Sequence, residues 1–145
     1  MFKKILFATD FSNASKKALN YIKQLRGAGA QEVVILHVID DKELLGLSRA
    51  ANQYLEIRAQ IEDEALKELA AMESDITSEG FSVEIKLKTG QPFTEIMKTA
   101  AEDNVSLISI GSHGRSNIEE MLLGSVSENV IRHAKVPVLL ISREV

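Results

Sequence analysis

The residue types best suited to chemistry gather directly after one apolar run of the sequence. Two glycines, a hydroxyl, an imidazole and a cation occupy five consecutive positions there, and a Gly-Ser pair follows further along. The set is Ile110, Gly111, Ser112, His113, Gly114 and Arg115, with Gly124 and Ser125 beyond them. Glycines let backbone N–H groups approach an anion closely, and a helix start adds unpaired donors. The pattern predicts a phosphate-binding site, although glycines that serve only as turn residues fit the same spacing.

Other phosphate and catalytic motifs are missing from the sequence. No Gly-x-x-x-x-Gly-Lys-Ser/Thr pattern occurs, so the chain has no P-loop. Gly27-Ala28-Gly29 resembles the start of a dinucleotide fingerprint, but it follows a predicted helix and precedes a strand, and we interpret it as a helix-end turn. The sequence has neither a Ser-His-Asp order nor a glycine-elbow motif, so it does not predict an acyl-transfer site.

The three histidines do not have the spacing of a metal site. No pair lies at an interval such as i, i+4. His37 falls within a predicted strand, where we expect a packed or hydrogen-bonded side chain. His113 falls in the glycine loop, where we expect it beside phosphate or in solvent. His133 falls near the C-terminal end of a predicted helix, where stabilisation by the helix dipole explains a histidine without any ligand.

Five β-rich runs alternate with helical spacing along the chain. The runs at residues 4–9 and 33–38 are apolar without alternation, as in strands covered on both faces, and residues 105–110 and 136–141 are two further candidate strands. The run at 81–87 alternates, which predicts an edge strand. Helices are predicted after the N-cap Ser12, over residues 54–76 before Gly80, from Pro92 to residue 100, and over 125–133. Gly46 and Ser48 interrupt the pattern from Asp40 to Asn52, which we expect to be a mobile loop.

The order β-α-β-α-β-α-β-α-β predicts an α/β fold with a parallel sheet and helices on both faces. Ligands of such open sheets bind beyond the carboxyl ends of the strands. The loops at that edge are residues 8–12, 38–40 and 111–125. No Pro-rich or Gly-rich linker divides the chain, so we expect residues 1–145 to form a single domain.

Composition narrows the function classes. The chain has 145 residues, 45% of them apolar, and no cysteine, which excludes thiol nucleophiles and iron–sulfur clusters and fits a reducing compartment. With 17 basic and 21 acidic side chains, the net charge of −4 argues against a broad nucleic-acid surface. The longest apolar run is far shorter than the roughly 20 residues that span a bilayer, and Asp10 interrupts any signal-peptide core. We expect a cytoplasmic protein with neither a nucleic-acid nor a membrane partner.

Taken together, the motifs carry a family resemblance. The glycine spacing resembles the nucleotide-binding signature of the ATP-binding branch of the universal stress protein family. In this sequence the spacing is Gly111, two residues, Gly114, nine residues, and then Gly124-Ser125. Residues 3–12, 36–40 and 136–141 are similar to that family's first, second and last strands, so the resemblance covers nearly the whole chain apart from about 41–50. The chain departs from the pattern at Ser106, where an acidic residue is common, and at Ser109, which interrupts the fourth apolar run.

The resemblance implies a five-stranded parallel sheet of order 3-2-1-4-5, Rossmann-like and similar to adenine-nucleotide hydrolases. It also implies a homodimer through the last strand, from Val136 to Ile141, and ATP as ligand, with Mg²⁺ arriving on the phosphates. Ala8 and Asp10 would lie by the nucleoside, and Val38 would meet adenine through its main chain. The implied ATP-binding set is completed by Ile110, Gly111, Ser112, His113, Gly114, Arg115, Gly124, Ser125 and Val126.

Two roles within that set stay open. Asp10 would repel a triphosphate, so its partners are ribose hydroxyls or a cation, unless it is only a neighbour of the first helix N-cap. Arg115 pairs with a phosphate oxygen or stays in solvent.

Three function hypotheses follow. The first is a homodimeric, nucleotide-dependent switch or sensor in stress response, in which ATP orders residues 111–125 and 40–52, with at most slow ATP hydrolysis or self-phosphorylation at Ser125. The second is a dimeric regulatory protein of the same fold that does not depend on ATP, and the intact glycine signature counts against it. The third is an adenylating enzyme, and the lack of a Ser-Gly-Gly-x-Asp-Ser loop after the first strand counts against that.

Overall fold

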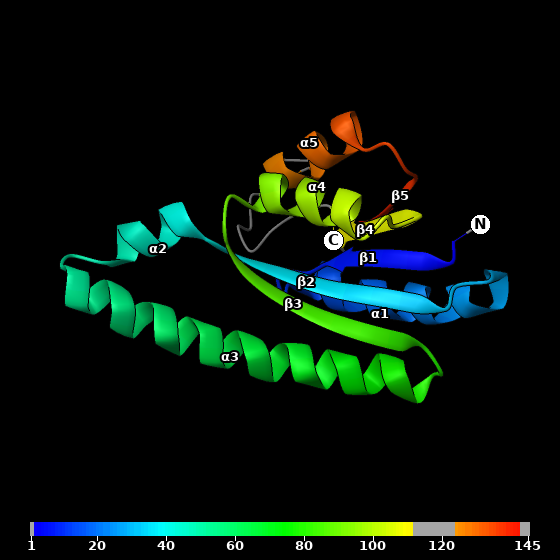
Figure 1. Cartoon of the computed structure of the whole chain (residues 1–145), viewed down its shortest axis with the longest axis horizontal. Coiled ribbons are helices and arrows are strands. Elements are labelled where there is room, and N and C mark those ends of the chain that lie inside the picture. The colour runs from blue at the N-terminus through cyan, green and yellow to red at the C-terminus, as the bar shows by residue number, and fades with distance from the viewer. Residues whose placement is uncertain (1, 112–123, 143–145) are drawn as a thin grey trace.

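The computed structural model describes residues 2–111 and 124–142 (Figure 1). Strands and helices alternate along the chain, as the sequence predicts. In chain order the elements are β1 (Lys4–Ala8), α1 (Asn13–Leu25), the 3-10 turn η1 (Arg26–Ala28), β2 (Glu32–Asp40), α2 (Asp41–Leu47), α3 (Ala51–Ser78), β3 (Ser82–Gly90), α4 (Pro92–Glu102), β4 (Leu107–Gly111), α5 (Ser125–His133) and β5 (Val138–Ile141).

The described strands form one parallel sheet in the order β3-β2-β1-β4-β5, which confirms the predicted order 3-2-1-4-5. Helices α1 and α3 pack on one face, and α4 and α5 pack on the other (Figure 1). Neighbouring residues of β1 serve opposite faces: Ile5 and Phe7 join the core under α1 and α3, whereas Leu6 joins the core under α4. This is why the central strands are continuously apolar.

The alternating segment forms β3, an edge strand, as predicted. Val83, Ile85 and Leu87 pack against the core under α3. The intervening charged side chains face α4, where Lys86 Nζ lies 2.7 Å from Asp103 Oδ2. That ion pair raises the pKa of Lys86 above its usual 10.5, chiefly through the hydrogen bond with the carboxylate.

The predicted helix signals act at the ends of the observed helices. Ser12 Oγ accepts a hydrogen bond from Ser15 N at 3.2 Å and caps α1, and Pro92 occupies the first turn of α4. Gly80 and Gly29 take the positive φ angles of 93° and 101° at the ends of α3 and η1. The interpretation of residues 27–29 as a helix-end turn is therefore confirmed.

The prediction of a mobile loop from Asp40 to Asn52 is wrong. Residues 41–47 form α2, and α3 begins at residue 51, three residues before the predicted start. Asp40 Oδ1 caps α2 by accepting from Lys42 N at 3.0 Å, and Leu44 is only 1% exposed. One cap and one buried side chain outweigh the cost of about 1 kcal/mol that Gly46 brings to the helix.

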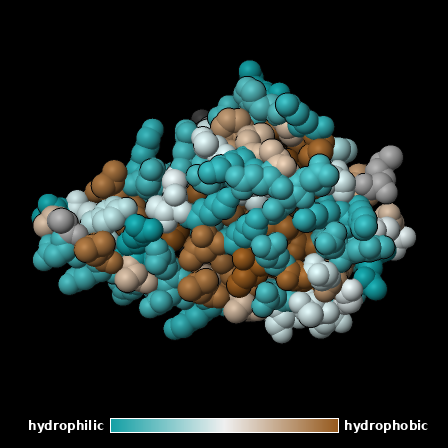
Figure 2. Space-filling model, viewed as in Figure 1, coloured by the Kyte–Doolittle hydropathy of each residue, from teal (hydrophilic) through white to brown (hydrophobic). Residues whose placement is uncertain are grey.

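The other side of α2 remains open to solvent. Leu45, Leu47 and Leu55 are 61%, 62% and 64% exposed. Figure 2 shows apolar atoms at the end of the molecule formed by α2 and the start of α3, in addition to a larger apolar group near the middle of the same face. No helix within the described residues is long and apolar enough to cross a membrane.

Two serines of the β4 region have opposite surroundings. Ser106 Oγ accepts from Lys4 N at 3.0 Å and donates to Lys4 O at 2.9 Å, which ties the approach to β4 onto β1. Ser109 is fully buried, and its Oγ has no hydrogen-bond partner among the described residues. A buried hydroxyl without a partner destabilises a fold by about 1–3 kcal/mol.

We therefore expect Ser109→Ala to raise the free energy of unfolding by about 1 kcal/mol, because the substitution removes an unpaired polar atom. Ser106→Ala is the matched control: it removes the same hydroxyl from a bonded position and should lower the free energy by about 1 kcal/mol. Urea denaturation with unchanged slope measures both. Equal destabilisation by the two variants would contradict the interpretation of Ser109.

Candidate functional site

One cavity of about 790 Å³ lies beyond the carboxyl ends of β1, β2 and β4, where the strand order predicts a ligand. Its size is within the range of small-molecule sites. All eight described members of the predicted set line it: Ala8, Asp10, Val38, Ile110, Gly111, Gly124, Ser125 and Val126. Ser112, His113, Gly114 and Arg115, the other four, lie outside the described residues.

The turn after β1 is held by Thr9. Its N–H donates to Leu36 O at 2.9 Å, which extends the pairing of β1 with β2 by one bond. Its Oγ1 accepts from Phe11 N at 3.0 Å and from the Ser15 hydroxyl at 2.6 Å. These contacts fix the direction in which the chain leaves the sheet toward α1.

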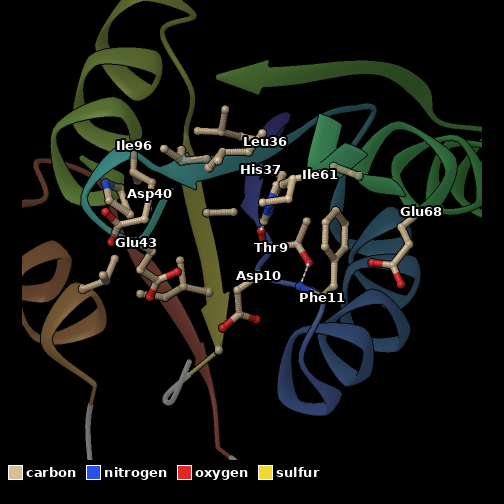
Figure 3. A pocket seen from close by; sticks show the side chains of 18 of the residues that line it. Thr9, Asp10, Phe11, Leu36, His37, Asp40, Glu43, Ile61, Glu68 and Ile96 are labelled. Carbon is tan, nitrogen blue, oxygen red and sulfur yellow. Dashed lines mark hydrogen bonds between the residues drawn. The ribbon is translucent and has the colours of Figure 1, made fainter. Parts of the chain in front are cut away.

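Asp10 lies beside the α1 N-cap and also lines the cavity. Its carboxylate lines the cavity, and its Oδ1 also accepts from Ser12 N at 2.9 Å. The side chain is thus both a neighbour of the α1 N-cap and part of the cavity lining (Figure 3). One carboxylate has about four acceptor sites, so it can accept from several donors at once.

His37 is hydrogen-bonded, as predicted, and it also lines the cavity, which the sequence did not indicate. Its Nδ1 lies 2.7 Å from Thr9 O. Because a carbonyl oxygen only accepts, Nδ1 carries the proton of this bond. The ring stacks on Phe11 with centroids 4.3 Å apart and 29° between the planes.

The N-terminus of α5 presents backbone donors to the cavity. Its N-cap is Gly124, which has an extended backbone and no side-chain cap, and Ser125, Val126 and Ser127 of the first turn line the cavity. Ser127 Oγ donates to Gly111 O at 2.6 Å and holds the helix start against the end of β4. A helix start of this kind favours an anion.

The start of α1 differs, because side chains already accept its backbone donors. Asp10 accepts from Ser12 N, and Ser12 Oγ accepts from Ser15 N. Helices α2 and α4 start at the same edge: Asp40 caps α2, and α4 has no side-chain cap but carries Pro92, which lacks an N–H, in its first turn. Among the described residues, the start of α5 has neither a side-chain cap nor a proline. The geometry therefore favours α5 for an anionic group.

Gly111 sits where the backbone of β4 passes α1 closely. A Cβ built there would lie 3.3 Å from Ala14 Cβ and 3.4 Å from Ser15 N, which is tighter than ordinary packing. The glycine at this position therefore has a steric reason that is independent of any ligand. It is the last residue of β4 and has no positive φ, so it does not serve as a turn glycine.

The part of the cavity formed by α2 and α3 combines apolar side chains with several carboxylates. Its walls come from α2 and α3, with Leu44, Leu47 and Ile61 among the apolar contributors. The charged residues that line the described cavity are Asp10, Asp40, Glu43, Glu64 and Glu68, against Lys67. An anion is disfavoured near these carboxylates. The α3 contributions were not predicted from the sequence. No group of three or more His, Asp or Glu side chains within the described residues could hold a metal ion.

These features define a Rossmann-like α/β protein with a ligand-sized cavity at the switch point of a doubly wound sheet. The family model described as Universal stress protein family matches residues 1–142, and the chain belongs to that family.

Individual members of the family are similar over nearly their whole length. Universal stress protein MJ0577 of Methanocaldococcus jannaschii is 36% identical, covering 99% of this chain and 97% of the relative. Its solved structure has a TM-score of 0.93 at 38% identity, covering 99% and 98% of the two chains. Universal stress protein YxiE of Bacillus subtilis is 36% identical over 97% of this chain and 99% of its own. A family protein of Arabidopsis thaliana, solved with AMP bound, has a TM-score of 0.67 at 19% identity, covering 98% of this chain and 92% of its own, which shows a shared fold.

The cap of α2 gives a test of the cavity wall. Asp40→Ala should lower the local stability of α2 by about 1 kcal/mol, because Lys42 N loses its acceptor. Amide hydrogen exchange over residues 43–47 should then accelerate about fivefold, while exchange in β1 stays unchanged. Asp41→Ala is the control, since it removes a carboxylate from the same turn without removing a cap. The same acceleration in both variants would mean that charge, and not the cap, holds α2.

Proposed function

We propose that this universal stress protein binds ATP in the cavity at the carboxyl edge of its sheet and acts as a nucleotide-dependent switch in stress response. The observation that carries the proposal is the uncapped start of α5, which faces the same cavity as Ala8, Asp10 and Val38. Backbone donors, a carboxylate and an apolar wall in one cavity match the three parts of a nucleotide.

Each part of ATP has a suitable environment. The phosphates would lie at α5, where the N–H groups of Ser125 and Val126 can donate to them. The ribose would lie near Asp10, because a carboxylate accepts well from hydroxyls. The base would lie against the apolar side chains at the ends of β2 and β4, with the main chain of Val38 at hand. The acidic lining near α2 and α3 disfavours the reverse orientation.

Mg²⁺ would accompany the nucleotide on its phosphates. A divalent ion there would offset the repulsion between a triphosphate and the carboxylates of the cavity. Asp10 is the carboxylate on the β1 turn that such an ion could approach.

The switch would act through α2. This helix has seven residues and depends on one cap and on Leu44, so little free energy separates its folded and unfolded states. Nucleotide in the cavity would stabilise the packed helix. The exposed Leu45 and Leu47 would then be presented to a protein partner in a fixed arrangement.

ATP binding is tested by thermal unfolding. With Mg-ATP at 100 times its Kd, stability should rise by about 2.7 kcal/mol, or roughly 5–11 °C in Tm for a chain of this size. Ser125→Pro removes one N–H donor, and proline is tolerated in the first turn of a helix after an extended residue such as Gly124. Losing a bond to a charged oxygen should weaken binding about 10–100-fold, so the gain at the same ATP concentration falls to about 0.4–1.4 kcal/mol.

Ser125→Ala is the matched control, because it loses the hydroxyl but keeps the N–H, and it should retain most of the shift. If Ser125→Pro and Ser125→Ala lose the ATP-induced stability gain equally, the backbone N–H of Ser125 does not bind ATP. If Mg-ATP does not raise the Tm of the native protein, ATP binding is ruled out, and the alternative of a dimeric regulatory protein that acts without ATP remains.

The predicted homodimer is tested at β5. This strand is an outer strand of the sheet, and Pro137 O accepts from Ile108 N. Because neighbouring residues of a strand point their backbone groups in opposite directions, Leu140 N–H faces away from β4. We expect a dimer by sedimentation at micromolar concentration, a monomer for Leu140→Pro, and a dimer for Leu140→Ala, which loses packing but keeps the N–H. A native monomer would rule out pairing through this strand.

A further inference from the structure

The turn that presents Asp10 contains a strained residue. Phe11 has φ 63°, in the left-handed region, where a bulky side chain is a true outlier. Within the described residues, the other non-glycine residue with positive φ is Asn104, whose residue type adopts this conformation readily. Strain of this kind persists where the surroundings enforce it and is concentrated at functional sites.

Two contacts and burial enforce the conformation of Phe11. Its N–H donates to Thr9 Oγ1, and its ring stacks on His37 at 4.3 Å. The His37 ring is fixed in turn by its bond to Thr9 O at 2.7 Å. Phe11 is 7% exposed, so the ring has little freedom to leave the stack.

The strained conformation determines where Asp10 points. With Phe11 left-handed, Ser12 N–H turns back and donates to Asp10 Oδ1 at 2.9 Å, which orients the carboxylate. In Figure 3 the Phe11 ring and the Asp10 carboxylate extend in different directions from the turn, with the carboxylate in the cavity. Phe11 and His37 also line the cavity themselves, and their stack acts on Asp10 through the backbone that carries it.

We infer that the stack of Phe11 on His37 is a positioning device that aims the Asp10 carboxylate at the ribose and so sets the preference of the site for ribonucleotides over deoxyribonucleotides. The inference rests on the proposed function. Phe11 and His37 are positioning residues in it, and Asp10 makes the contact. A carboxylate that accepts from a ribose hydroxyl gains a charge-assisted bond that depends strongly on direction.

The test compares the Kd values of ATP and 2′-deoxy-ATP by calorimetry. The native protein should prefer ATP about tenfold to a hundredfold, the value of one hydrogen bond to a charged group. Phe11→Leu should bring this ratio close to one, because the Asp10 carboxylate is no longer aimed at the ribose, whereas a change in the cavity wall alone would alter both Kd values by the same factor. Phe11→Tyr keeps the stack and should keep the preference. Asp10→Ala should lose the preference as well, and combining it with Phe11→Leu should cause no further loss.

A second variant keeps the test valid where Phe11→Leu fails to fold. His37→Gln retains an N–H donor for Thr9 O but removes the ring, and it should lower the ratio in the same way. If these variants weaken both nucleotides by one factor and keep the ratio, the stack only supports the fold and the inference is overturned. If the native protein binds both nucleotides equally, the inference is also overturned while nucleotide binding stands. If it binds neither, the proposed function itself fails.

Discussion

The hydrogen bonds of Thr9 are the constraint on which the site depends. Its N–H continues the pairing of β1 with β2, its Oγ1 accepts from Phe11 N and the Ser15 hydroxyl, and its carbonyl accepts from His37. One residue thus joins the central strand, its neighbour and the first helix at the edge of the sheet where a ligand fits. Since β1 is buried on both faces, this junction cannot shift without disturbing both cores.

Much of this architecture is encoded in local patterns of the sequence. The continuous apolar runs predict central strands, and alternation correctly places β3 at the edge. Caps such as Ser12 and Pro92 predict helix starts because their effect is local. The rule that ligands bind beyond the carboxyl ends of parallel strands, together with the family resemblance, predicts eight of the residues that line the cavity. It succeeds because these strand ends converge at one edge of the sheet.

What the sequence did not reveal depends on contacts between distant segments. Helix α2 was missed because Gly46 and Ser48 weaken its pattern, whereas its stability comes from the Asp40 cap and from the burial of Leu44 against other elements. The cavity residues of α3 were missed because the position of each turn depends on how β2 and α2 lead into the helix. Phe11 carries no local signal for a left-handed backbone, since its neighbours alone enforce it.

The starts of α1 and α5 show how little sequence separates a capped helix from one with open backbone donors. At α1, Ser12 supplies an oxygen to the first-turn donors, and the helix is stable without a ligand. At α5 the corresponding residue is Gly124, which has no oxygen to supply. Glycine at an N-cap is only a few tenths of a kcal/mol less stable than a polar cap, so leaving these donors for an anion has a small structural cost. In a chain of net charge −4, with carboxylates around the same cavity, oriented backbone groups of this kind would attract an anion locally, against the overall field of the protein.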